Sequence, residues 1–453
     1  MAIQSKNPYS NKILADFPEE TSETIFMKIT KANKAFLSWR SVKLSERIEK
    51  IQQLAEVLRK NQEQYARIIV AEMGKPITQA MAEIEKCAWV CDYYVQNAPK
   101  FMTPEIVKTE AVEAKMVIEP LGVILAIMPW NFPFWQAIRM MVPTLLVGNT
   151  VTLKHASNVP QAALAIESAF VEAGFPAGVL QTLLISSKKV EAVINHPLVR
   201  AISLTGSETA GKIVAAQAGS QLKKTLMELG GNDPFIILED ADVDKAAKVG
   251  CNMRLHNAGQ ICNSPKRMIV VKSRLEQFTN ELLREIKLKR VGNPEEKETE
   301  IGPLASEEAV AIVAKQVEAS VKLGAKILFG GKVGDRSTVY LPTIITGVKK
   351  GMPCYDEEVF GPVCAVISAE DNEDAIRIAN DSEFGLSASL WTNNLELVNK
   401  YVSELYVGLV VVNDKASSDP RLSFGGVKKS GYGRELSQYA LYEFANIKAV
   451  VVN

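Results

Sequence analysis

The stretch that decides the fold begins with Val123-Ile-Leu-Ala-Ile127, a short apolar run rich in β-branched residues. Similar runs follow along the chain, and segments of helical character lie between or after them: strand-like 150–153, 179–184 and 201–204, helix-like 162–173 and 209–218. This alternation predicts a parallel sheet with helices on its faces, and therefore an α/β fold.

A second block with the same alternation follows the pair Gly230-Gly231, which we take as the hinge between the blocks. Its strand-like runs begin with Pro234-Phe-Ile-Ile-Leu238 and continue at 268–271 and 406–413. The first hundred residues instead carry apolar residues at helical spacing, so we expect helices there. The chain ends with a strand, Ile447-Lys-Ala-Val-Val-Val452, which needs a sheet edge to pair with.

The composition is that of an ordinary globular protein with large cores. Apolar residues make up 47% and charged residues 23% of 453 residues, enough chain for two or three domains. Lys plus Arg and Asp plus Glu each number 52, so no basic excess points to nucleic acid. We find neither a secretory signal nor a membrane-spanning run, and the six cysteines are spread as in a reducing compartment. A cytoplasmic enzyme without a metal site is expected.

Three residues together suggest covalent chemistry on a carbonyl group. Cys262 lies in Asn257-Ala-Gly-Gln-Ile-Cys-Asn-Ser-Pro-Lys266, a small loop after a helix-like stretch. Its thiolate would attack an aldehyde and later leave as a thioester. Glu228, within an apolar run, should have a raised pKa that suits a general base for hydrolysing that thioester. The amide of Asn131, with the backbone N–H of Cys262, would stabilise the oxyanion.

Taken singly, each of these residues also has a structural explanation. Cys262 alone would be a packing residue, Glu228 could pair with Lys223 or Lys224, and Asn131 could be a turn residue between prolines. The candidate cofactor residues are also weak signals when taken singly, because a lone Gly-Ser turn is common and exposed lysines usually have no such role. Gly206-Ser207 forms a turn that opens a helix, and such a turn suits a pyrophosphate, while Lys154 at a strand end could reach ribose hydroxyls.

In combination, six ordered motifs resemble the NAD(P)-dependent aldehyde dehydrogenase superfamily over essentially the whole chain. They are Pro129-Trp-Asn-Phe-Pro133, Thr205-Gly-Ser207, Glu228-Leu-Gly-Gly231, Gly259-Gln-Ile-Cys262, Glu358-Val-Phe-Gly-Pro362 and Phe424-Gly-Gly-Val-Lys-Lys-Ser-Gly431.

The resemblance implies three parts that work as a homodimer or homotetramer. They are a Rossmann-like cofactor domain (1–111 and 137–229), an α/β catalytic domain (230–434) and a small β oligomerisation extension (112–136 and 435–453). It also implies that Cys262 is the nucleophile, Glu228 the general base and Asn131 the oxyanion donor. The cofactor contacts it implies are Glu358 and Phe360 at the nicotinamide ribose and ring, Trp130, Gly206 and Ser207 at the pyrophosphate, and Lys154 at the adenosine ribose.

Two local features refine the expected cofactor and substrate. Ser157 stands where NAD-preferring members often have a Glu, so a repelling charge is absent and a hydroxyl is available to a 2′-phosphate. NADP is therefore the expected cofactor, with NAD as an alternative. Arg139 resembles the arginine of succinate semialdehyde dehydrogenases and could bind a distal carboxylate, with Trp135 beside it and Ser418 as a second contact.

The expected reaction is therefore the oxidation of succinate semialdehyde to succinate. Three alternatives stay open: another small or ω-carboxy aldehyde, acyl transfer to coenzyme A, and an inactive binding protein with this fold. For Arg139, the alternative is a salt bridge on a helix surface.

Overall fold

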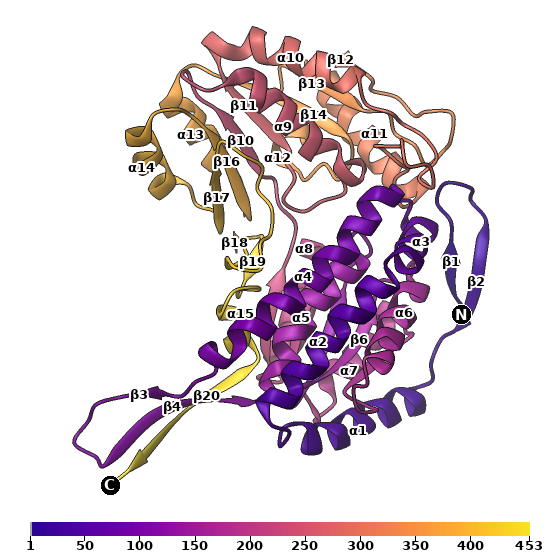
Figure 1. Cartoon of the computed structure of the whole chain (residues 1–453). Coiled ribbons are helices and arrows are strands. Elements are labelled where there is room, and N and C mark those ends of the chain that lie inside the picture. Colours follow the sequence, from indigo (N-terminus) through magenta and orange to yellow (C-terminus); the bar gives the residue numbers. More distant parts are fainter. Residues whose placement is uncertain (1) are drawn as a thin grey trace.

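The computed structural model describes residues 2–453 and has two α/β bodies with a projecting arm of strands (Figure 1). The first body contains a six-stranded sheet in the order β19-β9-β8-β5-β6-β7. All its neighbouring pairs are parallel except β19 with β9. Its strands are β5 (Val123–Met128), β6 (Thr150–His155), β7 (Leu180–Thr182), β8 (Val199–Thr205), β9 (Lys224–Glu228) and β19 (Gly431–Tyr432).

Helices cover both faces of this sheet. Along β5, Val123 and Leu125 pack into one apolar core with Ile25, whereas Ile124 and Ala126 pack into another with Leu54. This alternation follows from the period of two in a strand, and burial on both faces explains why the run is apolar throughout. The helices of this body are α1 (Ser22–Trp39), α2 (Leu44–Lys60), α3 (Gln62–Met73), α4 (Ile77–Phe101), α5 (Pro133–Val147), α6 (Pro160–Glu172), α7 (Val190–Asn195) and α8 (Glu208–Ser220).

The second body is built on a seven-stranded sheet in the order β12-β13-β14-β11-β10-β16-β17, with only β12 antiparallel to its neighbour. Its strands are β10 (Pro234–Ile237), β11 (Arg267–Val271), β12 (Lys326–Phe329), β13 (Thr343–Thr346), β14 (Val363–Ala369), β16 (Ser387–Trp391) and β17 (Leu409–Val412). Its helices are α9 (Val243–Leu255), α10 (Leu275–Lys287), α11 (Glu307–Lys322), α12 (Pro353–Asp356), α13 (Asn372–Asn380) and α14 (Leu395–Glu404). A two-stranded ribbon of β15 (Phe384–Gly385) and β18 (Val427–Lys428) completes it.

The arm is a three-stranded antiparallel sheet in the order β20-β4-β3, and it extends away from both bodies (Figure 1). It consists of β3 (Glu105–Ile106), β4 (Glu113–Pro120) and β20 (Ala445–Val452), which follows the short helix α15 (Tyr439–Glu443). The terminal strand thus finds its expected partner within the chain, since all eight of its residues pair with β4.

Two features differ from the sequence expectation. The first hundred residues are not helical throughout, because β1 (Ala2–Lys6) and β2 (Ile13–Pro18) form a hairpin before α1. In addition, residues 123–136, expected in the extension, form β5 and the start of α5 in the first body. We therefore propose that the extension comprises 105–122 and 445–453, with the cofactor domain resuming at β5.

Within residues 2–453, no helix is both long and apolar enough to cross a membrane.

Candidate active site

The candidate nucleophile lies in a loop that begins where helix α9 ends in a sharp backbone turn. After α9, a short 3₁₀ turn at His256–Gly259 contains Asn257 and Ala258 in the left-handed region, at φ 51° and 53°. Side chains other than glycine rarely adopt this conformation, and it turns the chain sharply toward Cys262. The side-chain amide of Asn257 donates to the Asn131 carbonyl oxygen at 3.1 Å, which anchors the turn to the first body.

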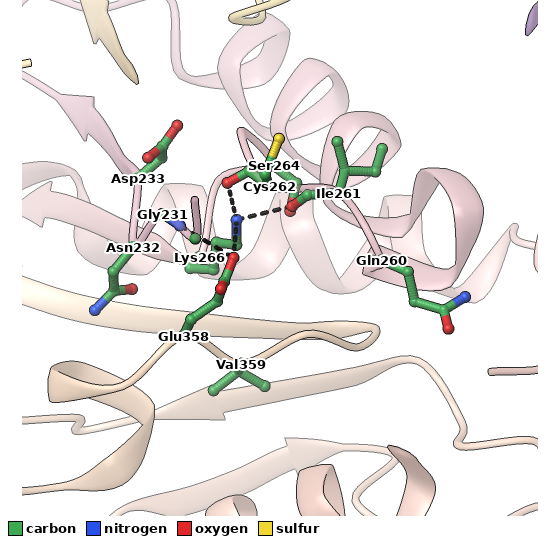
Figure 2. A network of polar contacts seen from close by, with 12 residues as sticks. Gly231, Asn232, Asp233, Gln260, Ile261, Cys262, Ser264, Lys266, Glu358 and Val359 are labelled. Carbon is green, nitrogen blue, oxygen red and sulfur yellow. Dashed lines mark hydrogen bonds and ion pairs between the residues drawn. The ribbon is translucent and has the colours of Figure 1, made fainter. Parts of the chain in front are cut away.

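The buried ammonium group of Lys266 holds the loop that contains Cys262 in place. Its Nζ donates to the Ile261 carbonyl at 2.8 Å and to the Cys262 carbonyl, and it forms an ion pair with Glu358 Oε1 at 3.1 Å (Figure 2). The same Glu358 oxygen accepts from the backbone N–H of Gly231 at 3.2 Å. The cysteine loop, the loop between β9 and β10 that contains Gly231, and the loop that carries Glu358 are therefore joined at one point.

Two glycines are required at this junction because neighbouring atoms approach their Cα atoms too closely for a side chain to fit. A Cβ on Gly230 would lie 2.3 Å from Glu358 Oε2, and one on Gly231 would lie 2.7 Å from the Cys262 carbonyl oxygen. Either distance is too short for a non-bonded contact. Gly230-Gly231, taken from the sequence as a hinge, is thus also the place where the Cys262 and Glu358 loops meet.

The thiol of Cys262 is protonated in the resting site. Burial raises its pKa to about 11, and the positive charges of Lys266 and Arg139 offset this only in part. Because only the thiolate attacks a carbonyl carbon, the site must remove this proton as the substrate reacts. A base near the thiol is therefore needed.

Glu228 has the environment expected of such a base. It is buried at the carboxyl end of β9, and its Oε1 has no hydrogen-bond partner among the described residues. Burial raises the pKa of Glu228, the negative charge of Glu435 raises it further, and Arg139 opposes both. The charge of Glu228 in turn raises the pKa of Cys262, so the two groups interact.

Neither lysine near Glu228 in the sequence pairs with it. Lys223 donates to the carbonyl oxygens of Ile194 and His196, and Lys224 lies 3.9 Å from Glu443. The structural explanation offered by the sequence, a Glu228–lysine pair, is therefore wrong. Burying a carboxyl group without a hydrogen bond costs free energy, and among residues 2–453 no lysine pair offsets that cost at Glu228.

Asn131 is anchored beside the cysteine loop. Its Nδ2 donates to the Gln260 carbonyl oxygen at 2.9 Å, two residues before Cys262, and its side chain is buried. An amide nitrogen carries two hydrogens, so one remains for an oxyanion. Asn131 follows β5 and precedes α5, which places it at the carboxyl edge of the first sheet.

Two cavities of about 280 Å³ each meet at Cys262. The first brings together the predicted substrate residues Trp135, Arg139 and Ser418. The second brings together the predicted catalytic and cofactor residues Trp130, Asn131, Gly206, Ser207, Glu358 and Phe360. Cys262 therefore lies between a space for a small molecule and a space lined by the carboxyl ends of β5 and β8, which is where α/β sheets bind nucleotides.

The second cavity carries features that suit a dinucleotide. Ser207 caps α8, its Oγ accepting from the Ala210 N–H at 3.3 Å, so the helix N-terminus opens beside Gly206. The rings of Trp130 and Phe360 lie edge to face at 5.9 Å between centroids.

Lys154 and Ser157 lie apart from this cavity. Lys154 is buried in β6, and burial lowers its pKa. Ser157 is exposed and lines a further cavity of about 530 Å³ with Lys188 and Lys189, which the sequence alone did not single out.

Arg139 is not a surface residue. Only 2% of it is exposed, its Nη2 lies 2.5 Å from Glu435 Oε2 and 3.9 Å from Glu228 Oε2, and its guanidinium lies 5.0 Å from the centre of the Phe424 ring. The alternative of a salt bridge on a helix surface is therefore wrong, because the ion pair is buried. Glu435, the partner of Arg139 in this ion pair, was not singled out by the sequence.

Comparison with known proteins agrees with this geometry. The model of the aldehyde dehydrogenase family matches residues 1–450. A probable NADP⁺ succinate-semialdehyde dehydrogenase of Synechocystis is 43% identical over 451 residues, covering 99% of both chains. A succinate-semialdehyde dehydrogenase [NADP⁺] 1 of Mycobacterium bovis is 42% identical over 454 residues, again with 99% of both chains covered. The crystal structure of a Streptococcus pyogenes succinic semialdehyde dehydrogenase with NADP⁺ superimposes with a TM-score of 0.97 at 38% identity, covering 99% of both chains.

The family model spans nearly the whole chain, and the relatives match it from end to end. This protein belongs to the aldehyde dehydrogenase family.

Proposed function

We propose that the protein oxidises succinate semialdehyde to succinate with NADP as the preferred cofactor. The observation that carries the proposal is the position of Cys262 at the junction of two cavities, one lined by Arg139 and the other by nucleotide-binding elements. The names of the Synechocystis, Mycobacterium and Streptococcus relatives support the same substrate and cofactor.

In the first step, Cys262 Sγ adds to the aldehyde carbon and a thiohemiacetal forms. The thiol proton passes to Glu228, the buried carboxyl group that interacts with it. The oxyanion would accept hydrogen bonds from Asn131 Nδ2 and from the backbone N–H of Cys262. The thiohemiacetal carbon would lose its hydride to the nicotinamide, the acceptor that bound NADP would supply.

In the second step, the resulting thioester is hydrolysed. Glu228 first releases the thiol proton to solvent and then removes a proton from water, which attacks the thioester carbon. The tetrahedral intermediate expels the Cys262 thiolate, which takes the proton from Glu228 as the carboxylic acid leaves. A base is needed here because water is a weak nucleophile at neutral pH. The buried, hydrogen-bond-free Oε1 of Glu228 supports this role.

The residues present suit NADP. Trp130, Gly206, Ser207, Glu358 and Phe360 would hold the pyrophosphate and nicotinamide portions, and Lys154 the adenosine ribose. The cavity lined by Ser157 also contains Lys188, Lys189 and Glu19, and Glu19 pairs with Lys189 at 3.5 Å. The Ser157 hydroxyl and the Lys188 ammonium group would therefore supply the donor and the positive charge that a 2′-phosphate requires. Nothing in this cavity excludes NAD, so NAD remains the weaker alternative cofactor.

The substrate end would be recognised in the first cavity. Trp135 and Ser418 line it with Arg139, and a cationic, largely apolar wall suits a small aldehyde with a distal carboxylate. Other ω-carboxy aldehydes share this chemistry. Acyl transfer to coenzyme A is disfavoured because it needs no hydrolytic base, and an inactive binding protein would not need Cys262, Glu228 and Asn131 together.

We further propose a cytoplasmic homodimer or homotetramer. All six cysteines are free thiols, as expected in a reducing compartment. The arm exposes apolar side chains and an unpaired strand edge, which need a partner. Exposed members are Ile106, Val107, Val112, Ile447, Val451 and Val452.

The test is NADPH formation from succinate semialdehyde, glutarate semialdehyde and butanal, each with NADP and NAD. We expect the parent to favour succinate semialdehyde with NADP. Cys262→Ala should lower the rate by a factor of roughly 10³ or more while NADP binding, followed by quenching of tryptophan fluorescence, is kept. Turnover retained by this variant would refute the mechanism, and equal oxidation of butanal would refute the substrate.

A further inference from the structure

Three cations line the substrate cavity, namely Arg139, Lys86 on α4 and the exposed Lys415. Lys86 belongs to none of the sequence motifs considered above. It lines the same cavity as Cys262, Arg139 and Ser418. Its side chain is half-buried, and its Nζ donates to Ser418 Oγ at 2.8 Å and lies 4.4 Å from the centre of the Trp135 ring. Two of the predicted substrate residues therefore contact Lys86 directly.

Among the described residues, Arg139 has a carboxylate partner, whereas Lys86 does not. Arg139 forms a buried ion pair with Glu435 and has Glu228 nearby, so its charge is already compensated within the protein. Lys86 forms no ion pair with any carboxylate within residues 2–453, and Ser418 is its single hydrogen-bond partner there. An ammonium group carries three donors, so two of them remain for a ligand.

We propose that Lys86 is the residue that pairs with the distal carboxylate of the substrate, with Ser418 and the Trp135 ring holding its ammonium group in place. A carboxylate in the cavity would give Lys86 the counter-charge that it lacks, whereas at Arg139 it would have to compete with Glu435. The inference rests on the proposed oxidation of a carboxylate-bearing aldehyde and adds a specificity-determining residue to it.

The surroundings of Lys86 make this role sensitive to pH. Burial and the positive charge of Arg139 on α5 lower the pKa of Lys86 to about 8, although Cys87, Asp419 and Glu83 act in the opposite direction. Lys86 is therefore charged below about pH 8 and loses its charge as the pH rises above this value. A bound carboxylate favours the charged form, so binding and protonation support each other.

The experiment compares the parent with Lys86→Met and Lys86→Arg. The readout is the ratio of kcat/KM for succinate semialdehyde to that for butanal. In Lys86→Met we expect this ratio to fall by about 10-fold to 100-fold, as for loss of a hydrogen bond to a charged group, mainly through KM of the semialdehyde. Lys86→Arg should restore part of the ratio because the charge is kept. Lys100→Met, an exposed lysine at the other end of α4, is the matched control and should behave as the parent.

Binding gives a second readout that does not depend on turnover. Succinate titrated into Cys262→Ala by calorimetry should bind at least about 10-fold more weakly after Lys86→Met is added. In addition, the KM for succinate semialdehyde should rise above about pH 8 in the parent but not in Lys86→Arg, since a guanidinium stays charged.

The outcomes separate the two proposals. If the parent prefers succinate semialdehyde and Lys86→Met keeps both the preference and succinate affinity, the Lys86 inference is overturned and the proposed function stands. If the parent shows no preference over butanal, the proposed substrate itself is refuted, and the inference falls with it.

Discussion

At the scale of single residues, the chemistry depends on two groups that are both protonated more strongly than usual. Burial raises the pKa of Cys262 to about 11 and raises that of Glu228 as well. In both cases the charged form is disfavoured by loss of hydration. A site of this kind holds the thiol in an unreactive form until a substrate and a base are in place.

The rate should therefore rise with pH across the neutral range. Glu228 acts as a base only after losing its proton, and because its pKa is raised, a larger share of it becomes ionised as the pH increases. We expect kcat to increase between about pH 7 and pH 9. Measured pH–rate profiles with butanal avoid the separate effect of Lys86 on carboxylate binding. A kcat that falls over this range would contradict the role of Glu228.

Glu228→Gln tests the same group by stopping the second step. The amide cannot accept a proton from water, so the thioester should accumulate. Rapid mixing with NADP and aldehyde should then show a burst of about one NADPH per active site, itself slower than in the parent because the thiol has lost its proton acceptor, followed by a rate at least roughly 100-fold slower than the parent. Steady turnover at the parental rate without a burst would exclude Glu228 as the hydrolytic base.

Cofactor choice is also decided by single side chains. Ser157→Glu places a carboxylate in the cavity lined by Lys188 and Lys189, where it would repel a 2′-phosphate and bind ribose hydroxyls. We expect the ratio of kcat/KM for NADP to that for NAD to fall by about 10-fold or more, measured at saturating aldehyde. An unchanged ratio would show that the 2′-phosphate lies elsewhere. Lys188→Ala should weaken the binding of NADP and leave the binding of NAD unchanged.

At the scale of elements, the N-terminus of α5 is held by a buried carboxylate. Glu83 Oε1 accepts from the backbone N–H groups of Phe134 and Trp135 at 2.9 and 3.0 Å, and Oε2 pairs with the fully buried Lys75. Free N–H groups at a helix start need such acceptors, and the helix dipole favours negative charge there. This cap positions the helix that begins two residues after Asn131.

Glu83→Gln should therefore destabilise the protein by about 3 kcal/mol, because it leaves the Lys75 ammonium buried without a counter-charge. Denaturation in urea measures this loss. The double variant Lys75→Met with Glu83→Gln should recover part of it, since the unpaired charge is gone. If the single and double variants were equally stable, the ion pair would not be what Glu83 contributes.

Seven strands of the two sheets were predicted from the sequence, namely β5, β6, β7, β8, β10, β11 and β17, whereas the other six and the N-terminal hairpin were not. Val123–Met128 and residues 268–271 of β11 are continuous apolar runs because both faces of their sheets are covered, and such runs are easily found in a sequence. The hairpin of β1 and β2 has no apolar run of this kind: β2, at Ile13–Pro18, contains Asp16 and is largely exposed. Its strands are specified by pairing with each other and by contacts such as that of Ser5 with Glu72, which are invisible in local composition.

At the scale of the whole molecule, the arm of β3, β4 and β20 has one face and one edge available to another copy of the chain. Ile447 and Val451 are 52% and 58% exposed, and residues four apart on a strand lie on the same face. Replacing both by Lys should disrupt an oligomer built through this face because charged side chains would be buried there. Light scattering after size-exclusion chromatography should then show a smaller species than the parent.

Lys448→Ala provides the control for this experiment. Lys448 lies on β20 between the two substituted positions but points to the other face, where it pairs with Glu119 of β4. Removing the Lys448 side chain should leave the measured mass of the oligomer unchanged. An unaltered mass in the double variant as well would show that the arm is not the subunit interface.

The sequence by itself determined the α/β architecture, the family and the identities of Cys262, Glu228 and Asn131 as candidates. These were accessible because buried parallel strands have a local signature and because each motif is contiguous in the chain. Only the tertiary structure decided which partner each cation meets: Arg139 the Glu435 carboxylate, Lys266 the Glu358 carboxylate, and Lys86 the Ser418 hydroxyl. Those partners are separated by 92 to 332 residues, and their approach depends on how helices and loops pack, which no local pattern encodes.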